Sequence, residues 1–382
     1  MTRPDQQAIP AGTANPVPQR PLGRIDVTRA FLPPLEAYHA LMQEVWGSRQ
    51  LTNNGALVQR LEKALIPYHG SPHVLFTGNG TIALQIALQA LEITGEVITT
   101  PYSYVASTTA ILWEHCTPVF ADIDPGTFCL SPDAIEACIT PRTRAILATH
   151  VYGLPCDVDR IGAIARKHGL QVIYDGAHAF GTIYRGKSLL SYGDASTCSF
   201  HATKLFHSVE GGSMATPHAP VYERMRLLRA FGHVKDEHFL PGINGKNSEL
   251  HAAMGLLVLE HFAAIQERRG QQWQRYHRLL RGSNVGLATV PADTDHNHAY
   301  FPVVLKNEAT LHQVLAVLAK DDIHPRRYFY PSLSTLPYLA SGGSCPVAED
   351  IARRVLCLPL FHDLPEEVID HIAAHVLRAN EP

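Results

Sequence analysis

The chain has 382 residues, of which 46% are hydrophobic and 18% are charged, so it is long enough to bury the cores of two globular domains. Its net charge of -3 provides no broad attraction to nucleic acid or to an anionic membrane. No apolar run reaches the length of a membrane span, no signal-peptide pattern opens the chain, and the seven cysteines lack paired spacing. We therefore expect a cytoplasmic globular protein with no nucleic-acid or membrane partner.

Apolar runs alternate with helical patterns through the first half of the chain. Residues 1–24 are rich in proline and poor in apolar side chains, which predicts a flexible arm. Helices are expected at residues 35–45 and 58–66, and Asn53 and Asn54 between them can form a turn or approach a polar ligand. Buried strands are expected at residues 74–76, 96–100, 117–122, 145–150, 172–174 and 196–200. This alternation predicts an α/β fold with a mostly parallel, doubly wound sheet.

A glycine-containing loop, Thr77-Gly78-Asn79-Gly80-Thr81, joins the first of these strands to a helix expected at residues 82–91. Such a unit presents backbone N–H groups and the positive end of a helix to an anion. The spacing matches neither the dinucleotide-binding nor the nucleoside-triphosphate-binding glycine motif. The loop is therefore either a phosphate site or a plain turn with a helix cap.

Two titratable residues follow buried strands later in the chain. Asp175 ends the strand at residues 172–174, and Lys204 lies in the polar, glycine-containing stretch 199–212. Parallel strands would bring both residues to the carboxyl edge of the sheet, where α/β folds bind ligands. A lysine with a lowered pKa forms Schiff bases, and an acid can keep a ring nitrogen protonated, which together suit pyridoxal phosphate. The alternative is a surface lysine in a turn, with Asp175 as a helix cap.

The chain after residue 212 completes the large domain and then predicts a second, smaller one. Helices are expected at residues 224–229, 250–262, 266–281 and 311–320 and after residue 363, and strands at residues 213–216 and 301–304. Ser248 or Asn247 can cap the second of these helices, and residues 363–366 resemble a capping box. The charged helix at residues 266–281 is expected to be exposed, with its charges mostly solvated.

His371 and His375 lie four residues apart on the last predicted helix and could bind a metal. No nearby acid or cysteine completes a site with them, and the His-Glu-x-x-His pattern is absent, so we expect no metal. The predicted division of the chain is an arm at residues 1–24, a large domain at residues 25–262 and a small domain at residues 263–382.

Several motifs in the same order resemble the DegT, DnrJ and StrS family of pyridoxal phosphate-dependent sugar aminotransferases, from about residue 32 to the C-terminus. They are residues 51–55, 79–84, 100–106, 174–181, 199–212, 242–249 and 326–331. Leu-Thr-Asn-Asn-Gly together with Phe-His-Ala-Thr-Lys is similar to the branch that forms dTDP-4-amino-4,6-dideoxyglucose. The resemblance implies a type I aminotransferase fold, with a seven-stranded, mostly parallel sheet and a smaller C-terminal α+β domain.

The resemblance also implies roles for individual residues. Lys204 would form a Schiff base with the cofactor, Asp175 would pair with the pyridinium nitrogen, and His178 would lie near the 3-hydroxyl group. Stacking on the ring is implied for Tyr104, although core packing is the alternative for this tyrosine. The phosphate would be held by Gly80, Thr81, Ser199 and, from the neighbouring subunit of a homodimer with shared active sites, Asn244.

For the substrate, the implied contacts are Asn53, Asn54, Tyr330 and Ser334. Many relatives have a histidine where this chain has Ser334, which bears on the identity of the sugar rather than on the chemistry. The implied reaction transfers an amino group from L-glutamate to C4 of dTDP-4-keto-6-deoxyglucose. The alternatives are a C3 aminotransferase acting on a 3-keto-6-deoxyhexose nucleotide and a non-catalytic regulator that binds pyridoxal phosphate. Dehydratases of the same fold have histidine in place of the lysine, so Lys204 argues against that activity.

Overall fold

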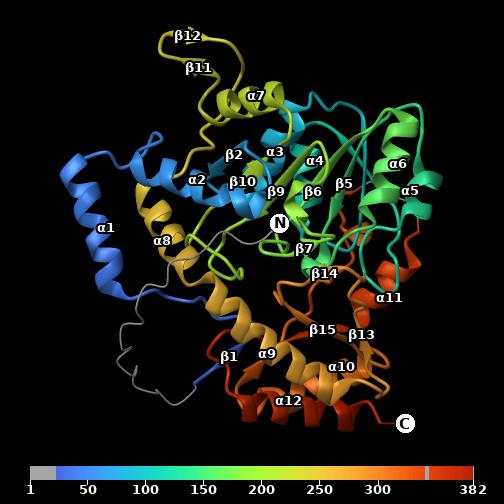
Figure 1. Cartoon of the computed structure of the whole chain (residues 1–382). Coiled ribbons are helices and arrows are strands. Elements are labelled where there is room, and N and C mark those ends of the chain that lie inside the picture. The colour runs from blue at the N-terminus through green and yellow to red at the C-terminus, as the bar shows by residue number, and fades with distance from the viewer. Residues whose placement is uncertain (1–22, 340–343, 382) are drawn as a thin grey trace.

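The computed structural model describes residues 23–339 and 344–381 (Figure 1). The predicted arm lies outside the described residues, apart from Gly23 and Arg24. A seven-stranded sheet in the order β2-β10-β9-β6-β5-β3-β4 forms the centre of the larger part. Its strands are β2 Val74–Thr77, β3 Glu96–Thr99, β4 Thr117–Phe120, β5 Thr143–Thr149, β6 Gln171–Asp175, β9 Ala195–Ser199 and β10 Gly212–Ala215. Only β10 runs antiparallel to its neighbours, so the predicted mostly parallel sheet is confirmed.

Helices cover both faces of this sheet, because successive side chains of a strand point to opposite faces. In β6, Ile173 packs with α3, α4 and α7, whereas Val172 and Tyr174 pack in a cluster with α2, α5, α6 and α8. Burial on both faces explains why the strands read as continuous apolar runs. The helices are α2 Ala56–His69, α3 Gly80–Ala90, α4 Val105–Trp113, α5 Pro132–Cys138, α6 Val158–His168, α7 Ala219–Arg229 and α8 Glu249–Glu260.

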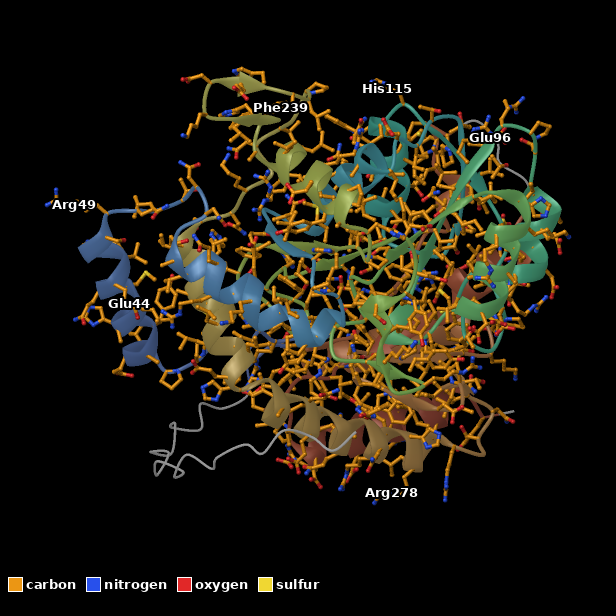
Figure 2. The ribbon with its side chains drawn as sticks, turned by 45° about the horizontal axis from the view of Figure 1, so that its top comes forward. Glu44, Arg49, Glu96, His115, Phe239 and Arg278 are labelled. Carbon is orange, nitrogen blue, oxygen red and sulfur yellow. The ribbon has the colours of Figure 1, made fainter. Side chains whose placement is uncertain are left out.

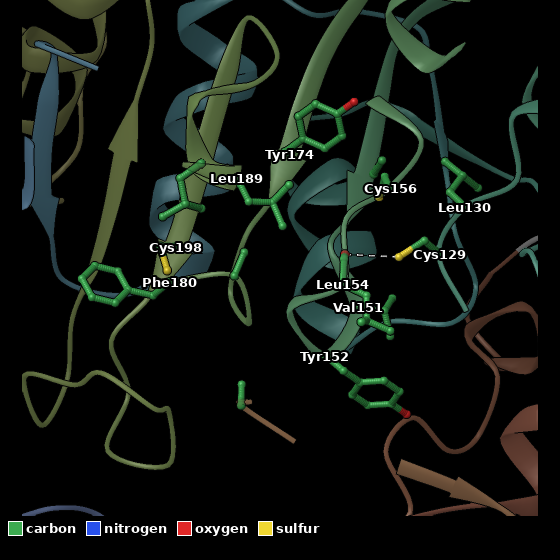
Figure 3. Close-up of a cluster of buried hydrophobic side chains, with 14 of the residues drawn as sticks. Cys129, Leu130, Val151, Tyr152, Leu154, Cys156, Tyr174, Phe180, Leu189 and Cys198 are labelled. Atoms are coloured by element: carbon green, nitrogen blue, oxygen red, sulfur yellow. Dashed lines mark hydrogen bonds between the residues drawn. The ribbon is translucent and has the colours of Figure 1, made fainter. Parts of the chain in front are cut away.

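Figure 3 shows part of the second cluster, where Tyr174 and Cys198 lie among apolar side chains. Cys129, Cys156 and Cys198 are buried free thiols in this region, as the unpaired spacing predicted. The Cys129 thiol donates to the Leu154 carbonyl at 3.5 Å. These cysteines therefore serve as packing groups in the core.

The C-terminal part of the chain forms a smaller α+β unit below the large sheet in Figure 1. Its main elements are α9 Phe262–Leu280, β13 Gly286–Leu287, β15 Phe301–Val304, α10 Glu308–Ala319, β16 Ile323–His324, α11 Pro346–Arg354, β17 Val355–Leu358 and α12 Glu366–Ala379. The short strand β1 (Ile25–Asp26) pairs with β16, and Ile25 packs in the core of this unit. Residue 25 thus lies with the small unit, although the predicted division assigned it to the large domain; the boundary after residue 262 stays a prediction.

The remaining described elements are short or peripheral. They are α1 Leu35–Ser48, β7 Ile183–Tyr184, β8 Lys187–Ser188, β11 His233–Val234, β12 Glu237–His238 and β14 Thr294–Asp295, with one-turn helices at Val151–Gly153, Leu189–Ser191 and Leu333–Thr335. Within residues 23–339 and 344–381, no helix is long and apolar enough to cross a membrane.

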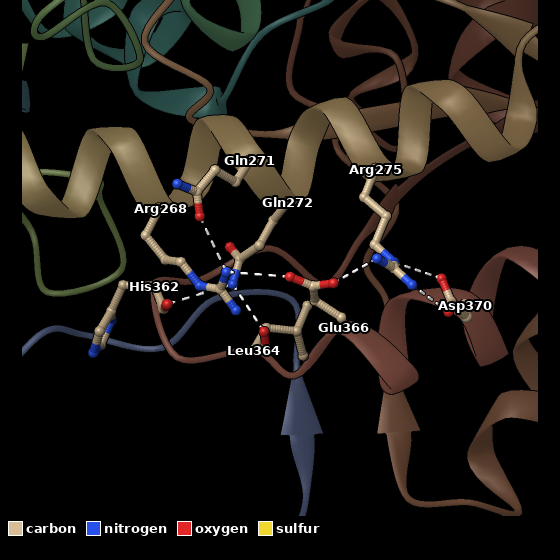
Figure 4. A network of polar contacts seen from close by, with 8 residues as sticks. All are labelled: Arg268, Gln271, Gln272, Arg275, His362, Leu364, Glu366 and Asp370. Atoms are coloured by element: carbon tan, nitrogen blue, oxygen red, sulfur yellow. Dashed lines mark hydrogen bonds and ion pairs between the residues drawn. The ribbon is translucent and has the colours of Figure 1, made fainter. Parts of the chain in front are cut away.

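The long helix α9 differs from its prediction, because it is tied to α12 along one face (Figure 4). Arg275 binds the Asp370 carboxylate with two nitrogens at 2.7 and 2.6 Å and also reaches Glu366 at 2.5 Å. Arg269 is 4% exposed and donates to the carbonyls of His298 and Ala299. The prediction of mostly solvated charges therefore holds for Glu267, Arg278 and Arg281, which are exposed, and is wrong for Arg269.

Two predicted helix caps have different outcomes. Ser248 caps α8, since its side chain accepts the His251 N–H. The predicted capping box before α12 is wrong, because Pro365 occupies the N-cap and no side chain caps the helix. Asp363 instead pairs with Arg29 at 3.2 Å.

Candidate active site

A cavity of about 280 Å³ opens at the carboxyl ends of β5, β6 and β9. These strands are parallel and adjacent, so their ends meet at one edge of the sheet. Seven of the predicted cofactor residues line the cavity: Gly80, Thr81, Tyr104, Asp175, His178, Ser199 and Lys204. The fold therefore brings together groups that are up to 124 positions apart in the chain, counting from Gly80 to Lys204.

Asp175 is held at the end of β6 by a chain of hydroxyl groups. Ser107 Oγ donates to its Oδ2 at 2.6 Å, and the Ala177 N–H donates to its Oδ1 at 3.0 Å. Ser103 Oγ lies 2.9 Å from Ser107 Oγ and 3.0 Å from Thr149 Oγ1. The residues after Asp175 form a turn rather than a helix, so the alternative of a helix cap does not apply. The carboxylate is buried and fixed, and it faces the cavity.

Lys204 lies in the turn after β9 and is half-buried at the cavity wall. Among the described residues, no hydrogen bond or ion pair engages its ammonium group. Burial lowers the pKa of Lys204, while Tyr328 and Asp175 act in the opposite direction. A lowered pKa raises the share of neutral, nucleophilic amine near pH 7.

His178 is fixed in a neutral state beside Lys204. The Tyr152 N–H donates to its Nδ1 at 3.1 Å, and its ring stacks on Phe329 with a centroid distance of 5.5 Å. Burial, helped by the charge of Lys204, holds the pKa of His178 well below its usual range. Because Nδ1 accepts a hydrogen bond, the neutral ring carries its proton on Nε2, where it can donate.

The N-terminus of α3 also lines the cavity and could hold an anion there. The Asn79 side chain accepts the Ile82 N–H at 2.9 Å, whereas the first N–H groups of a helix have no intrahelical acceptor. Gly80 and Ser199 approach so closely that a Cβ added at Gly80 would lie 3.0 Å from Ser199 Cβ. A Cβ at Gly212 would lie 2.5 Å from the Asn79 carbonyl carbon. Glycine is required at residue 212, where a Cβ would clash with backbone atoms, whereas at residue 80 a side chain would crowd Ser199.

These residues fit pyridoxal phosphate by their chemistry. The cavity offers a helix N-terminus for a phosphate, an unengaged amine for an aldehyde, and a fixed carboxylate for a ring N–H⁺. The model of the DegT/DnrJ/EryC1/StrS aminotransferase family matches residues 36–377. The chain belongs to this family of aminotransferases.

Two relatives of the enzyme are named dTDP-4-amino-4,6-dideoxy-D-glucose transaminase. The proteins of Shigella dysenteriae and Escherichia coli are each 40% identical to it, over 92% of this chain and 98% of the relative. A "Pleiotropic regulatory protein" of Geobacillus stearothermophilus is 33% identical over 84% of this chain and 89% of its own.

Solved structures of sugar aminotransferases have the same fold as this enzyme. The structure of DesI in the presence of its TDP-sugar product has a TM-score of 0.89 and 34% identity and covers 94% of both chains. The structure of S. venezuelae DesV in complex with a ketimine intermediate has a TM-score of 0.84 and 28% identity, covering 93% of this chain and 99% of DesV. The predicted fold class is confirmed.

The cavity is also lined by residues for which the sequence indicated no individual role. Arg326 and Tyr328 line the cavity, and the guanidinium of Arg326 lies 4.6 Å from the ring centroid of Tyr328. Tyr104 also lines it and is 57% exposed, so the core-packing alternative for this ring is wrong. Ser103 and Ser107 were missed as well; Ser103 lies just before α4 and Ser107 in its first turn, and their hydroxyls lie 2.9 Å apart.

Asn244 lies outside the cavity of its own chain. It is exposed, and its Oδ1 accepts a hydrogen bond from Lys246 Nζ at 2.8 Å. Its predicted contact is with the phosphate of a neighbouring subunit, and that role stays a prediction.

The four predicted substrate residues also lie outside the cavity lining. Asn53 and Asn54 adopt left-handed conformations with φ of 61° and 62° in an exposed turn, which favours their interpretation as turn formers. The ring of Tyr330 is covered by the Arg327 guanidinium at 3.4 Å. Hydrogen bonds join the Ser334 hydroxyl to Ser332 and Glu349. A role in substrate binding stays a prediction for all four.

Proposed function

We propose that this aminotransferase uses pyridoxal phosphate to transfer the amino group of L-glutamate to C4 of dTDP-4-keto-6-deoxyglucose. The observation that carries the proposal is the unengaged amine of Lys204, which faces the same cavity as Asp175 and the N-terminus of α3. The choice of sugar and nucleotide rests on the two relatives of that name, which are 40% identical over nearly their whole length.

Each end of the cofactor would be held by a different part of the cavity. Lys204 Nζ would hold the aldehyde carbon covalently, Asp175 would accept the ring N–H⁺, and His178 Nε2 would donate to the ring oxygen. The phosphate would be bound by Gly80, Thr81 and Ser199, with Tyr104 over the ring face. When bound, pyridoxal phosphate supplies a cationic ring that accepts the electron pair left on a substrate carbon.

Lys204 would move the proton in both half-reactions. Its burial lowers the pKa of the amine, so Nζ can take a proton from the α-carbon of glutamate at neutral pH. In the second half-reaction Nζ would return a proton to the sugar carbon that receives nitrogen. His178 does not compete as a base, because burial holds its pKa well below the working range.

A homodimer with shared active sites forms part of the proposal. Apolar side chains stand exposed around the hairpin of β11 and β12: Phe231 is 49%, Phe239 55% and Ile243 43% exposed. Figure 2 shows Phe239 on this hairpin, which projects from the large unit. Exposed apolar groups gathered on one projection favour burial against a partner. Asn244 directly follows Ile243, so a partner seated on this hairpin would lie next to Asn244.

A substrate panel tests the proposed function. With L-glutamate as donor, we expect amination of dTDP-4-keto-6-deoxyglucose and at least about tenfold slower reaction of the 3-keto isomer, because the remote nucleotide positions one carbon at the amine. Preference for the 3-keto isomer would assign the enzyme to C3. Cofactor binding without turnover of either sugar would favour a regulator, the class named for the relative from Geobacillus stearothermophilus.

A further inference from the structure

A cluster of possible metal ligands lies on the small unit, on elements that contribute nothing to the cavity described above. The imidazoles of His371 and His375 are one turn apart on α12, with ring centroids 4.5 Å apart. In the sequence, no nearby acid was expected to complete a site with them. The fold supplies one, since Asp321 follows the end of α10 and its Oδ2 lies 2.8 Å from His371 Nε2. The interpretation that no nearby acid completes a site is therefore wrong.

The three side chains are held in place by the packing of α10 against α12. The two helices contribute buried residues to one shared core, namely Leu311, Val314, Leu318, Ile369, Ile372, Ala373 and Val376. The Asp321 N–H donates to the Leu318 carbonyl at 3.0 Å, which fixes the start of the turn. One ligand atom from each of Asp321, His371 and His375 lies within 4.8 Å of the other two. The packing of the two helices thus brings three candidate ligands together on one patch of the surface.

We propose that Asp321, His371 and His375 form a binding site for one divalent ion of the zinc class. Two imidazole nitrogens and one carboxylate oxygen suit zinc and its neighbours in the transition series, whereas calcium and magnesium prefer oxygen ligands alone. The ion would replace the hydrogen bond between His371 Nε2 and Asp321 Oδ2. Because Asp321 and His371 are exposed, water can fill the remaining coordination positions.

A bound ion would link the turn after α10, through Asp321, to α12, through His371 and His375. An ion that binds only the folded chain stabilises it, and the effect grows as its free concentration rises above the dissociation constant. The site lies outside the cavity lining, so its loss should leave transamination unchanged. Failure of this proposal and failure of the proposed function are therefore separate results.

The test is a titration of the chelator-treated holoenzyme with Zn²⁺ by calorimetry, and with Co²⁺ by visible absorption. We expect one ion per chain and a rise in Tm with Zn²⁺. His371→Ala, His375→Ala and Asp321→Ala should each weaken binding at least about tenfold, a loss that even an outer-shell change can cause. All three residues lie at the surface or half-buried, so the variants should fold.

His324→Ala is the matched control. His324 Nε2 also pairs with an aspartate, Asp322, at 2.7 Å. Among the described residues, however, this pair has no second imidazole close enough to form a three-ligand group. Its variant should bind Zn²⁺ as the parent does. The proposal is overturned if His375→Ala binds Zn²⁺ as tightly as the parent, or if the parent binds no ion at micromolar concentration.

Discussion

At the scale of single residues, the arrangement around Asp175 leads to a prediction for Ser107. Its hydroxyl donates to the carboxylate at 2.6 Å, and a hydrogen bond to a charged group contributes about 1.5–3 kcal/mol. Ser107→Ala should therefore lower kcat/KM by about tenfold to a hundredfold, because Asp175 would be held less firmly against the cofactor ring.

The controls for Ser107 separate positioning from folding. Ser107→Thr keeps a hydroxyl and should restore much of the rate, while Ser103→Ala should cost less because Ser103 contacts Ser107 rather than the carboxylate. The pH dependence of the visible cofactor band should shift in Ser107→Ala if the residue acts through Asp175. An unchanged band together with an unchanged rate would show that Ser107 only packs.

The sequence predicted the residues at strand ends better than those that support them. Asp175 and Lys204 could be placed because each follows a buried strand, and parallel strands end at a common edge. The partner of Asp175 could not, because Ser107 belongs to a helix 68 positions earlier and its side chain has many possible acceptors. The resemblance to relatives implied roles for residues that line the cavity. The hydrogen bonds that hold those residues in position, such as that from Ser107 to Asp175, can be seen only in the folded chain.

At the scale of secondary-structure elements, α9 shows what charge patterning leaves open. Its arginines predicted a solvated helix, because the sequence shows where the charges are but not which carbonyl or carboxylate groups each one contacts in the fold. In the structure Arg269 is buried against two carbonyl oxygens, whereas Arg275 pairs with carboxylates near the surface. The two residues should differ strongly in their contribution to stability.

Arg269→Met and Arg275→Met form a matched pair of variants for this difference. Arg269→Met would leave the His298 and Ala299 carbonyls without their donor, at a cost of about 1–3 kcal/mol for each buried group. Arg275→Met removes an ion pair near the surface, which contributes little to stability because water and salt screen it. Urea unfolding of both variants should rank them in this order, and equal losses would contradict the role given to the buried arginine.

At the scale of the whole molecule, the proposed shared sites lead to a prediction about mixed dimers. Asn244→Ala should weaken cofactor retention, and Lys204→Ala should be inactive. In a mixed dimer of the two variants, one site combines both parent residues and the other combines both changes. Co-expression should therefore give more activity than either variant alone.

Subunit exchange is the condition for that experiment, which is why co-expression is used. A monomer in solution at assay concentration would contradict the shared-site proposal. So would co-expressed mixtures that never exceed the activity of Asn244→Ala alone. In either case Asn244 would act as a turn residue, consistent with its bond from Lys246.

Buried neutral histidines make the stability of the chain depend on pH. Burial lowers the pKa of His69 and of His150 to about 3 and that of His296 to about 4, from an ordinary value of 6.5. Below that ordinary value the unfolded chain binds protons that the folded chain does not, so stability falls as pH falls. Each histidine should contribute up to about 1.4 kcal/mol per pH unit in this range.

The midpoint of urea unfolding at about pH 7 and at about pH 5 checks this prediction. The range lies above the ordinary pKa of carboxylates, so histidines dominate the change. We expect a lower midpoint at the lower pH, with the same change in His312→Ala, because His312 is an exposed control. Equal midpoints for the parent at the two pH values would contradict the prediction.

Transfer of nitrogen from donor to sugar tests the central claim most directly. The enzyme would be incubated with ¹⁵N-labelled L-glutamate and dTDP-4-keto-6-deoxyglucose, and the product would be analysed by mass spectrometry. The parent enzyme should form the labelled 4-amino sugar nucleotide. The rate of Lys204→Ala should fall by more than the ~10²–10⁴-fold that a general base contributes, because the covalent attachment of the cofactor is lost as well. A labelled product from Lys204→Ala at near the parent rate, or none from the parent, would contradict the account.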